Sequence, residues 1–220
     1  MAEQLFSEAH MIENAREYLE RLAFGFNDDN TCSAISTAMA LNYLSLQYKR
    51  DFVPPARRAE KRKETVPLSA LQVRADYPGT YSLHRYFVEK CDMKAVSYGD
   101  KITVPFRYYL ENTEGIDRGI ELNWTLFPKA STIKANIDSN LPVLITTTLA
   151  GKLSWHTMVC YGYREREGGG GMQLLLHNGW YGTEDTIWDP ADGTAAQKGT
   201  WVDKKIATYG YYFSLGSAAE

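Results

Sequence analysis

The stretch that decides the fold is residues 30–48, NTCSAISTAMALNYLSLQY. Its apolar residues Ile35, Ala38, Met39, Leu44 and Leu46 alternate with small residues. Most of the remaining positions hold small Ser, Thr and Ala residues, which let a helix lie close against its neighbours. Asn30 or Thr31 is the expected capping residue. We therefore expect a central buried helix from Thr31 to about Tyr48.

Further helical segments are expected before and after this helix. Residues 7–24 carry apolar side chains at helical spacing and begin at a capping serine. Residues 81–91 follow a Pro78-Gly79 turn, and residues 131–139 again begin at a serine cap. The basic, proline-bearing stretch 51–67 has little apolar pattern, so we expect a solvated loop or a short exposed helix.

The second half of the chain shows strand-like patterns, and from residue 142 onward their period is two. The segments are 102–110, 120–127, 142–149, 154–163, 172–177, 186–188 and 207–215. Residues 164–171, REREGGGG, are expected to join two strands as a hairpin; no Lys-Ser/Thr pair follows the glycines, which argues against a phosphate loop. These patterns predict an α+β fold in which an N-terminal helical lobe, with the central helix, packs on a C-terminal antiparallel sheet.

Length and composition limit the classes of protein that fit the chain. Its 220 residues suit a single domain, 1–220, with a mainly helical lobe at about 1–95 and a mainly β lobe at about 96–220. The hydrophobic share of 44% and the charged share of 23% are typical of a globular protein. A net charge of -3 argues against a nucleic-acid partner. No apolar run approaches the ~18 residues of a membrane span, so we expect a soluble protein.

The cysteines indicate free thiols. Cys32, Cys91 and Cys160 are an odd, widely spaced set that cannot form a fully paired disulfide framework, and they lack the close spacing of a zinc site. We expect no metal and no cofactor. Cys160 lies in an apolar strand and is expected in the core, whereas Cys91 ends a helix without an evident partner.

Three residues at the ends of predicted helices and strands indicate a catalytic site. The positive end of a helix dipole stabilises a thiolate, so Cys32 in a first turn is a candidate nucleophile. His156 begins a strand after a loop, and Asn178 ends the next strand, so hairpin pairing brings both to the same end of the sheet. An amide at Asn178 orients the imidazole. Trp180 is expected to cover this contact, and Trp155 to support the site.

Other polar residues have simpler interpretations. His177 points to the opposite face from the residue after it, and it is expected to be structural or solvent-facing. His10 and His84 lie on helical patterns without a partner motif. Asp185 and Asp189 are alternatives to the orienting asparagine if the strand register differs.

The order of cysteine, histidine and asparagine resembles the papain-like cysteine peptidase superfamily. Four segments carry the resemblance: NTCSAISTAMALNYL (30–44), IKANIDSNLPVLITT (133–147), SWHTMVCYGYRE (154–165) and LLLHNGWYG (174–182). They are most similar to the bacterial peptidase C39-like branch. The resemblance extends from about residue 27 to residue 212.

The resemblance implies a papain-like fold and a role for each of three residues. Cys32 corresponds to the nucleophile, His156 to the general base and acid, and Asn178 to the residue that holds the imidazole. Papain-like enzymes also place a glutamine about six residues before the cysteine, and its amide completes the oxyanion hole. Phe26 stands at that position here, so Asn27 is the nearest amide for this role.

Three classes of function use this arrangement. The expected one is a thiol-dependent hydrolase that cleaves peptide or isopeptide bonds of a peptide or protein substrate through an acyl-enzyme. A transglutaminase, deamidase or acyltransferase with the same triad is the first alternative, and a catalytically silent papain-like binding domain is the second. The oligomeric state stays open. The compartment lies between export or surface attachment, common among related bacterial proteins, and the cytoplasm.

Overall fold

The computed structural model describes residues 5–24, 30–63, 70–93, 97–148, 150–179, 186–189 and 194–217. The α-helices are α1 (Cys32–Tyr48), α2 (Ala70–Asp76), α3 (Pro78–Glu89), α4 (Asp100–Asn112) and α5 (Ala130–Asp138). The strands are β1 (His10–Met11), β2 (Ile120–Leu126), β3 (Val143–Thr147), β4 (His156–Glu165), β5 (Met172–His177), β6 (Thr186–Asp189), β7 (Thr194–Gln197), β8 (Thr200–Asp203) and β9 (Ala207–Leu215). Short turns of other helix types are η1 (Arg16–Glu20), η2 (Pro55–Arg57), η3 (Gly151–Leu153), η4 (Glu167–Gly169) and η5 (Lys204–Ile206).

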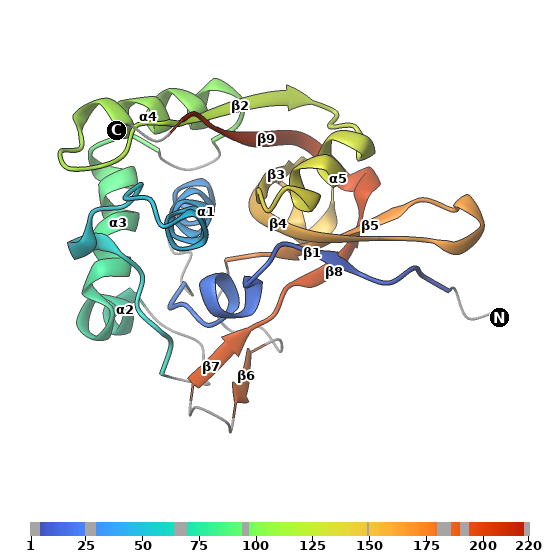
Figure 1. Cartoon of the computed structure of the whole chain (residues 1–220), viewed down its shortest axis with the longest axis horizontal. Helices are drawn as coiled ribbons and strands as arrows, with labels where there is room; N and C mark the ends of the chain where they lie inside the picture. The colour runs from blue at the N-terminus through green and yellow to red at the C-terminus, as the bar shows by residue number, and fades with distance from the viewer. Residues whose placement is uncertain are drawn as a thin grey trace.

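An antiparallel sheet holds most of the strands. They lie in the order β2-β9-β3-β4-β5-β8, and β1 pairs with the part of β4 that extends past β3. A second pair, β6 and β7, forms a small sheet at one end of the molecule (Figure 1). Across β3 and β4 the register places Thr147 opposite His156, and across β4 and β5 it places Val159 opposite His177. The start of β4 therefore has a neighbour in β3 but none in β5.

Helix α1 runs through the middle of the molecule, between α3 and the strands β3 and β4 (Figure 1). Every residue from Cys32 to Ser45 is buried, as expected for a helix with neighbours on all sides. Leu41 of α1, Phe87 of α3 and Val159 of β4 belong to one hydrophobic cluster. Burial of one such side chain stabilises the fold by about 2 kcal/mol. The same core thus joins the helices to the sheet.

The structure confirms the predicted α+β fold, and the expected central helix is α1. The expected strands appear as β2, β3, β4, β5, β6 and β9. Helix α3 begins at Pro78 rather than after a turn, because a proline at the first helical position loses no hydrogen bond within the helix. Helix α5 begins at Ala130 with Lys129 as its cap, so the predicted serine cap is wrong. The sequence patterns did not predict α2, β7 or β8.

The strand predicted for residues 102–110 is wrong, since this segment lies in helix α4. Its aromatic residues favoured a strand, but the buried positions Ile102, Phe106 and Tyr109 recur at helical steps. Packing of this face outweighs the strand propensity of the individual residues.

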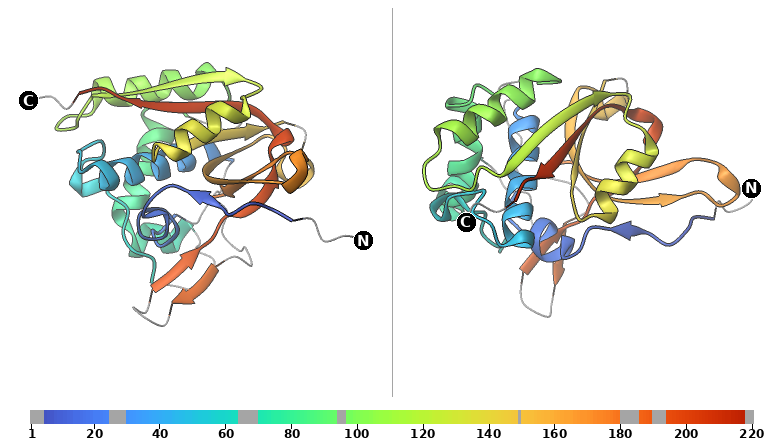
Figure 2. Two further views of the ribbon diagram at one scale, coloured as in Figure 1. Left: turned by 45° about the vertical axis from the view of Figure 1, so that its right-hand side comes forward. Right: turned by 45° about the horizontal axis from the view of Figure 1, so that its top comes forward.

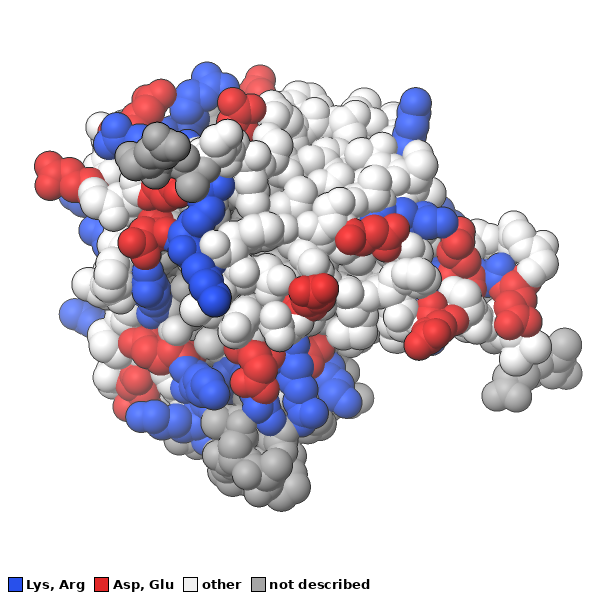
Figure 3. Space-filling model, in the orientation of Figure 1, with Lys and Arg blue, Asp and Glu red and all other residues white. Residues whose placement is uncertain are grey.

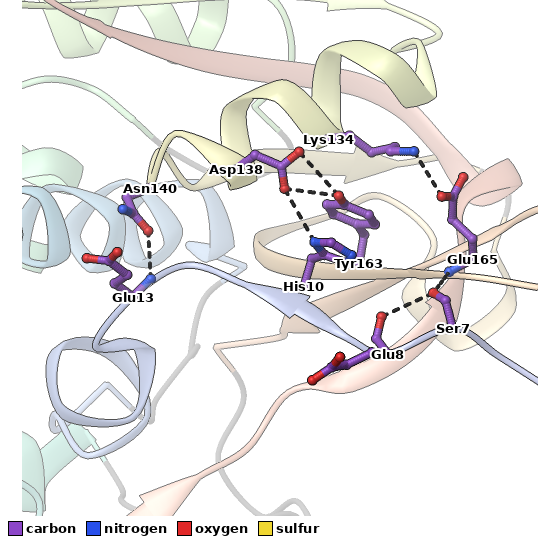
Figure 4. Close-up of polar contacts among 9 residues, drawn as sticks. All are labelled: Ser7, Glu8, His10, Glu13, Lys134, Asp138, Asn140, Tyr163 and Glu165. Carbon is purple, nitrogen blue, oxygen red and sulfur yellow. Dashed lines mark hydrogen bonds and ion pairs between the residues drawn. The ribbon is translucent and has the colours of Figure 1, made fainter.

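The helix predicted for residues 7–24 is also wrong, because strand β1 and the turn η1 take its place. The main chain of β1 pairs with β4, with His10 opposite Tyr163, where β3 has ended. Figure 4 shows the side chains that hold this strand: the His10 ring stacks on Tyr163 at 4.7 Å between centroids, and the Tyr163 hydroxyl donates to Asp138 at 2.9 Å. The apolar residues of the predicted helix are nevertheless buried, namely Ile12, Ala15, Leu19 and Leu22.

The stretch 51–67 differs from the solvated loop that its composition suggested. Phe52, Val53 and Arg62 are fully buried, and η2 is its only helical turn within the described residues. A guanidinium is rarely buried to this extent without polar partners. These three side chains therefore belong to the interior, whereas Asp51, Pro55 and Ala56 are exposed and η2 has no buried residue, as expected for a short exposed helix.

Charges of both signs lie side by side on the face shown in Figure 3, mainly over the helical side and the β4–β5 hairpin. The same hairpin extends beyond the rest of the molecule in Figure 2. Among the helices of the described residues, none is long and apolar enough to cross a membrane.

Candidate active site

Cys32 is the first residue of α1, and its side chain is 5% exposed. The main-chain N–H of Thr157 donates to its Sγ at 3.4 Å. One helical turn further along, the hydroxyl of Ser36 donates to the carbonyl of Thr157 at 2.8 Å. The pairing of β5 with β4 begins only at Val159, so among the described residues no strand lies on that side of Thr157. Side chains of α1 contact the main-chain N–H and carbonyl of Thr157 there instead. The thiol is thereby held against the start of β4.

His156 is the first residue of β4, so it directly precedes the residue that contacts the thiol. Its ring is 3% exposed, and its Nε2 lies 2.6 Å from the main-chain oxygen of Asn178. Burial lowers the pKa of His156 to about 4, and the contact with this carbonyl partly opposes the shift. At neutral pH the ring is uncharged. A carbonyl only accepts hydrogen bonds, so the proton sits on Nε2 and Nδ1 carries the basic lone pair.

Asn178 directly follows β5, and its main-chain carbonyl contacts the His156 ring. The orienting role of the side-chain amide stays a prediction. Gly179, the next residue, has φ of +67°, a conformation that glycine adopts without strain. A Cβ at this position would lie 3.1 Å from Cγ2 of Ile35 on α1. The turn that presents the carbonyl thus packs on the same helix that carries Cys32.

His84 also lies beside the start of α1, although its sequence pattern indicated no partner. Its Nε2 is 2.8 Å from the hydroxyl of Thr31, the residue that caps α1. The ring is 2% exposed, and burial lowers its pKa to about 3. His84 comes from α3, about fifty positions along the chain, so no local sequence signal could have found this contact.

The other residues that the sequence singled out, His177, Cys91 and Cys160, are buried side chains. His177 is 1% exposed; burial and the nearby Arg62 charge lower its pKa to about 3. Its Nδ1 accepts from the N–H of Gly179 at 3.2 Å, so it is structural rather than solvent-facing. Cys91 and Cys160 are buried, and burial raises the pKa of each thiol to about 12.

Three of the predicted site residues, Asn27, Trp180 and Asp185, lie outside the described residues. Asp189 ends β6, which pairs with β7 and belongs to the smaller sheet. Trp155 lies directly before His156 with φ of +56°, and half of its side chain is exposed. Within the described ranges, no group of three or more His, Cys, Asp and Glu side chains is arranged to hold a metal ion.

The geometry describes a thiol at a helix N-terminus facing a sheet that carries a buried imidazole, which is the arrangement of a papain-like cysteine peptidase fold. Residues 17–219 match the model of the Peptidase_C39 like family, and the chain belongs to this family.

A solved structure supports the same fold. The crystal structure of UfSP from C. elegans is similar with a TM-score of 0.50 and 11% sequence identity. The similarity covers 97% of this chain but only 35% of that one, so the chain spans about a third of the length of UfSP. None of the curated proteins matches the chain.

Proposed function

We propose that this protein is a thiol-dependent hydrolase that cleaves peptide or isopeptide bonds. The observation that carries the proposal is the 3.4 Å contact between the Thr157 N–H and the Sγ of Cys32, because it joins the thiol to the strand that begins with His156. A donated hydrogen bond and a helix N-terminus both favour the thiolate. Membership of a peptidase family supports the same function.

In the proposed mechanism, Nδ1 of His156 takes the proton of the Cys32 thiol, and the thiolate attacks the scissile carbonyl. The tetrahedral oxyanion is stabilised by first-turn N–H groups of α1, which have no acceptor within the helix. The amide of Asn27 is proposed as a further donor. The protonated imidazole then gives its proton to the leaving amine, and a thioester forms. Water deprotonated by His156 attacks the thioester, which releases the acid and restores the thiol.

The carbonyl of Asn178 keeps the imidazole in the required tautomer during both steps. It accepts from Nε2 at 2.6 Å, so Nδ1 is the nitrogen that exchanges protons. Burial lowers the pKa of His156 to about 4, so at neutral pH the ring is uncharged and Nδ1 has the lone pair that a general base requires. Trp180 is proposed to cover this contact.

The experiment is incubation with a peptide library, with and without a primary amine, followed by mass spectrometry of the products. New peptide termini that require Cys32 support hydrolysis. Amine incorporation or glutamine-to-glutamate conversion without chain cleavage would instead assign the transferase or deamidase class. The Cys32→Ala variant should abolish turnover, and Cys91→Ala is the matched control because it removes a buried thiol elsewhere in the core.

Absence of any product, together with a Cys32 thiol that a peptidyl thiol probe does not label, would overturn the proposal. That outcome would favour the alternative hypothesis of a catalytically silent papain-like binding domain.

A further inference from the structure

Four aromatic side chains form a row beside the candidate active site, which we call the aromatic ledge: Tyr98, Trp124, Trp155 and Tyr209. Adjacent rings in the row are in contact, with centroid distances of 6.0 Å for Trp155–Tyr98, 5.6 Å for Tyr98–Tyr209 and 5.7 Å for Tyr209–Trp124. Trp155 is 50% exposed and Trp124 is 39% exposed. Large aromatic side chains are rarely left open to water in a connected group without a function.

The row lies next to both candidate catalytic residues in the chain. Trp155 immediately precedes His156 in the chain. At the side of the nucleophile, the hydroxyl of Ser33 lies 3.4 Å from the carbonyl of Ser97, and Ser97 immediately precedes Tyr98. Tyr98 is therefore tied to the residue after Cys32 while its ring contacts the residue before His156.

The ledge is exposed because a helix ends beside it. On β2, Ile120, Leu122 and Trp124 point to the same face, and the first two are buried. The hollow between α4 and β2 is lined by side chains of both elements, including Leu122. Helix α4 begins at Asp100, whose Oδ1 accepts from Nε1 of Trp124 at 2.9 Å. Trp124 thus continues an apolar sheet face past the end of its covering helix.

A hollow lies between the outer rings of the ledge and the start of α4. Its volume is about 280 Å³, and Tyr98, Gly99, Asp100, Lys101, Trp124 and Tyr209 line it. This volume is near the lower limit of ~300 Å³ for ligand pockets, which suits one large side chain rather than a whole ligand. A Cβ at Gly99 would lie 3.2 Å from the Trp124 ring, so the glycine keeps this wall of the hollow open.

The rim carries one charge of each sign, so it has no net charge that would attract an ionic occupant. The ammonium of Lys101 lies 5.1 Å from the centre of the Tyr98 ring and already takes the position that a bound cation would seek. The carboxylate of Asp100 offsets the Lys101 charge and accepts from Nε1 of Trp124. The rim therefore favours an uncharged side chain, and ring faces favour one that is aromatic or large and apolar.

We propose that the aromatic ledge binds an aromatic or large apolar side chain of the peptide that Cys32 attacks. This inference rests on the proposed function, since it names the substrate class of the same site. Binding there holds the peptide beside Tyr98, which follows Ser97, the residue that accepts from the Ser33 hydroxyl next to Cys32.

The test uses blocked Gly-Ser hexapeptides that carry a single Phe at each position in turn, with the Phe-free peptide and a Lys-scanned set as comparisons. Each peptide competes with iodoacetamide for Cys32, and mass spectrometry measures the concentration that halves the rate of alkylation. In the wild type, Phe at one position at least should lower this concentration about tenfold relative to the Phe-free peptide, a difference of about 1.4 kcal/mol.

Two variants assign the effect to the ledge. Trp124→Ala and Tyr209→Ala lie at the end away from the catalytic contact, and each should reduce the preference for Phe to less than about threefold. Tyr108→Ala is the matched control: it removes a 44% exposed aromatic side chain from α4, outside the ledge, and should keep the full preference. Equal protection by Phe-bearing and Phe-free peptides overturns the proposal, as does stronger protection by Lys or an equal loss in Tyr108→Ala.

A second experiment distinguishes a failure of the proposed function from a failure of the ledge proposal. The same peptides are titrated into the Cys32→Ala variant, and indole fluorescence reports their binding without any thiol chemistry. Phe-dependent binding that disappears in Tyr209→Ala would support the ledge even if the library shows no cleavage. Cleavage by the wild type without a Phe preference would support the peptidase and overturn the ledge.

Discussion

Nε2 of His84 lies 2.8 Å from the hydroxyl of Thr31, the residue immediately before Cys32. Both side chains are buried, and the contact joins α3 to the cap of the nucleophile helix. Thr31→Val keeps the shape of the side chain and removes the hydroxyl. The expected loss is about 1 to 3 kcal/mol in the free energy of unfolding, because a buried imidazole nitrogen loses its partner.

The same substitution should slow alkylation of Cys32, since the first turn of α1 is then less firmly held. Urea unfolding and the iodoacetamide rate measure the two effects. Thr31→Ser keeps the hydroxyl and should retain the wild-type rate. Equal rates for the Val and Ser variants would show that this hydrogen bond does not position the thiol.

Three buried histidines make stability depend on pH. Burial lowers the pKa of His156 to about 4 and that of His84 and His177 to about 3, from an ordinary value near 6.5. Between these pH values the histidines are protonated in the unfolded chain but not in the folded chain. Their contribution to the free energy of unfolding is therefore fully present above pH 6.5 and is lost as the pH falls toward the folded pKa values. Each unit of difference is worth about 1.4 kcal/mol.

We expect the free energy of unfolding to decrease from pH 7 to pH 5, a range above the ordinary titration of carboxylates. His177→Gln should reduce this slope. An unchanged slope in His177→Gln would contradict the assignment.

The three thiols should differ in reactivity. Burial holds the pKa of Cys91 and Cys160 near 12, so at pH 8 only about one in ten thousand of either is thiolate. Cys32 instead lies at the N-terminus of α1, and its Sγ accepts from the Thr157 N–H. Iodoacetamide followed by peptide mapping should label Cys32 first, and His156→Ala should slow that labelling. Equal labelling of all three cysteines in the folded protein would argue against an activated nucleophile.

Most of this fold could be predicted because its signals are local. The apolar and small residues of 30–48 predicted α1, and period-two alternation predicted the strands that carry the site. The errors occurred where distant packing decided the outcome. Residues 102–110 are rich in strand-forming aromatics, yet they lie in α4, and residues 7–24 have helical spacing but pair with β4 at His10.

The candidate site divides in the same way. Cys32 and His156 lie at the ends of elements whose limits are visible in the sequence. The contact between His84 and Thr31 depends on how α3 packs beside α1, and the ring contacts of Tyr98 depend on tertiary neighbours from β9 and the start of β4. Neither has a signal in sequence spacing.

The role of Asn178 can be separated from that of its side chain. Because Nε2 of His156 contacts the main-chain oxygen, Asn178→Ala retains the partner of the imidazole. We expect a loss of less than about tenfold in kcat/KM on a peptide found in the library, compared with about 10² to 10⁴ for His156→Ala, which removes the general base. A loss in Asn178→Ala as large as in His156→Ala would assign the orienting role to the amide.

The position of that main-chain oxygen depends on the next residue. Gly179 has φ of +67°, and a Cβ there would meet Cγ2 of Ile35 at 3.1 Å, so in Gly179→Ala the turn or the Ile35 side chain must shift by a few tenths of an ångström. Gly168 offers a matched control: its φ is +79°, but a Cβ there meets nothing within 4 Å. Both alanine variants should lose about 1 to 2 kcal/mol of stability from the strained backbone. Only Gly179→Ala should also reduce kcat/KM, by about tenfold or more, because the carbonyl that holds His156 moves with the turn. Urea unfolding and steady-state kinetics on the same peptide give both quantities, and equal kcat/KM in the two variants would mean that packing of this turn on Ile35 does not control the imidazole.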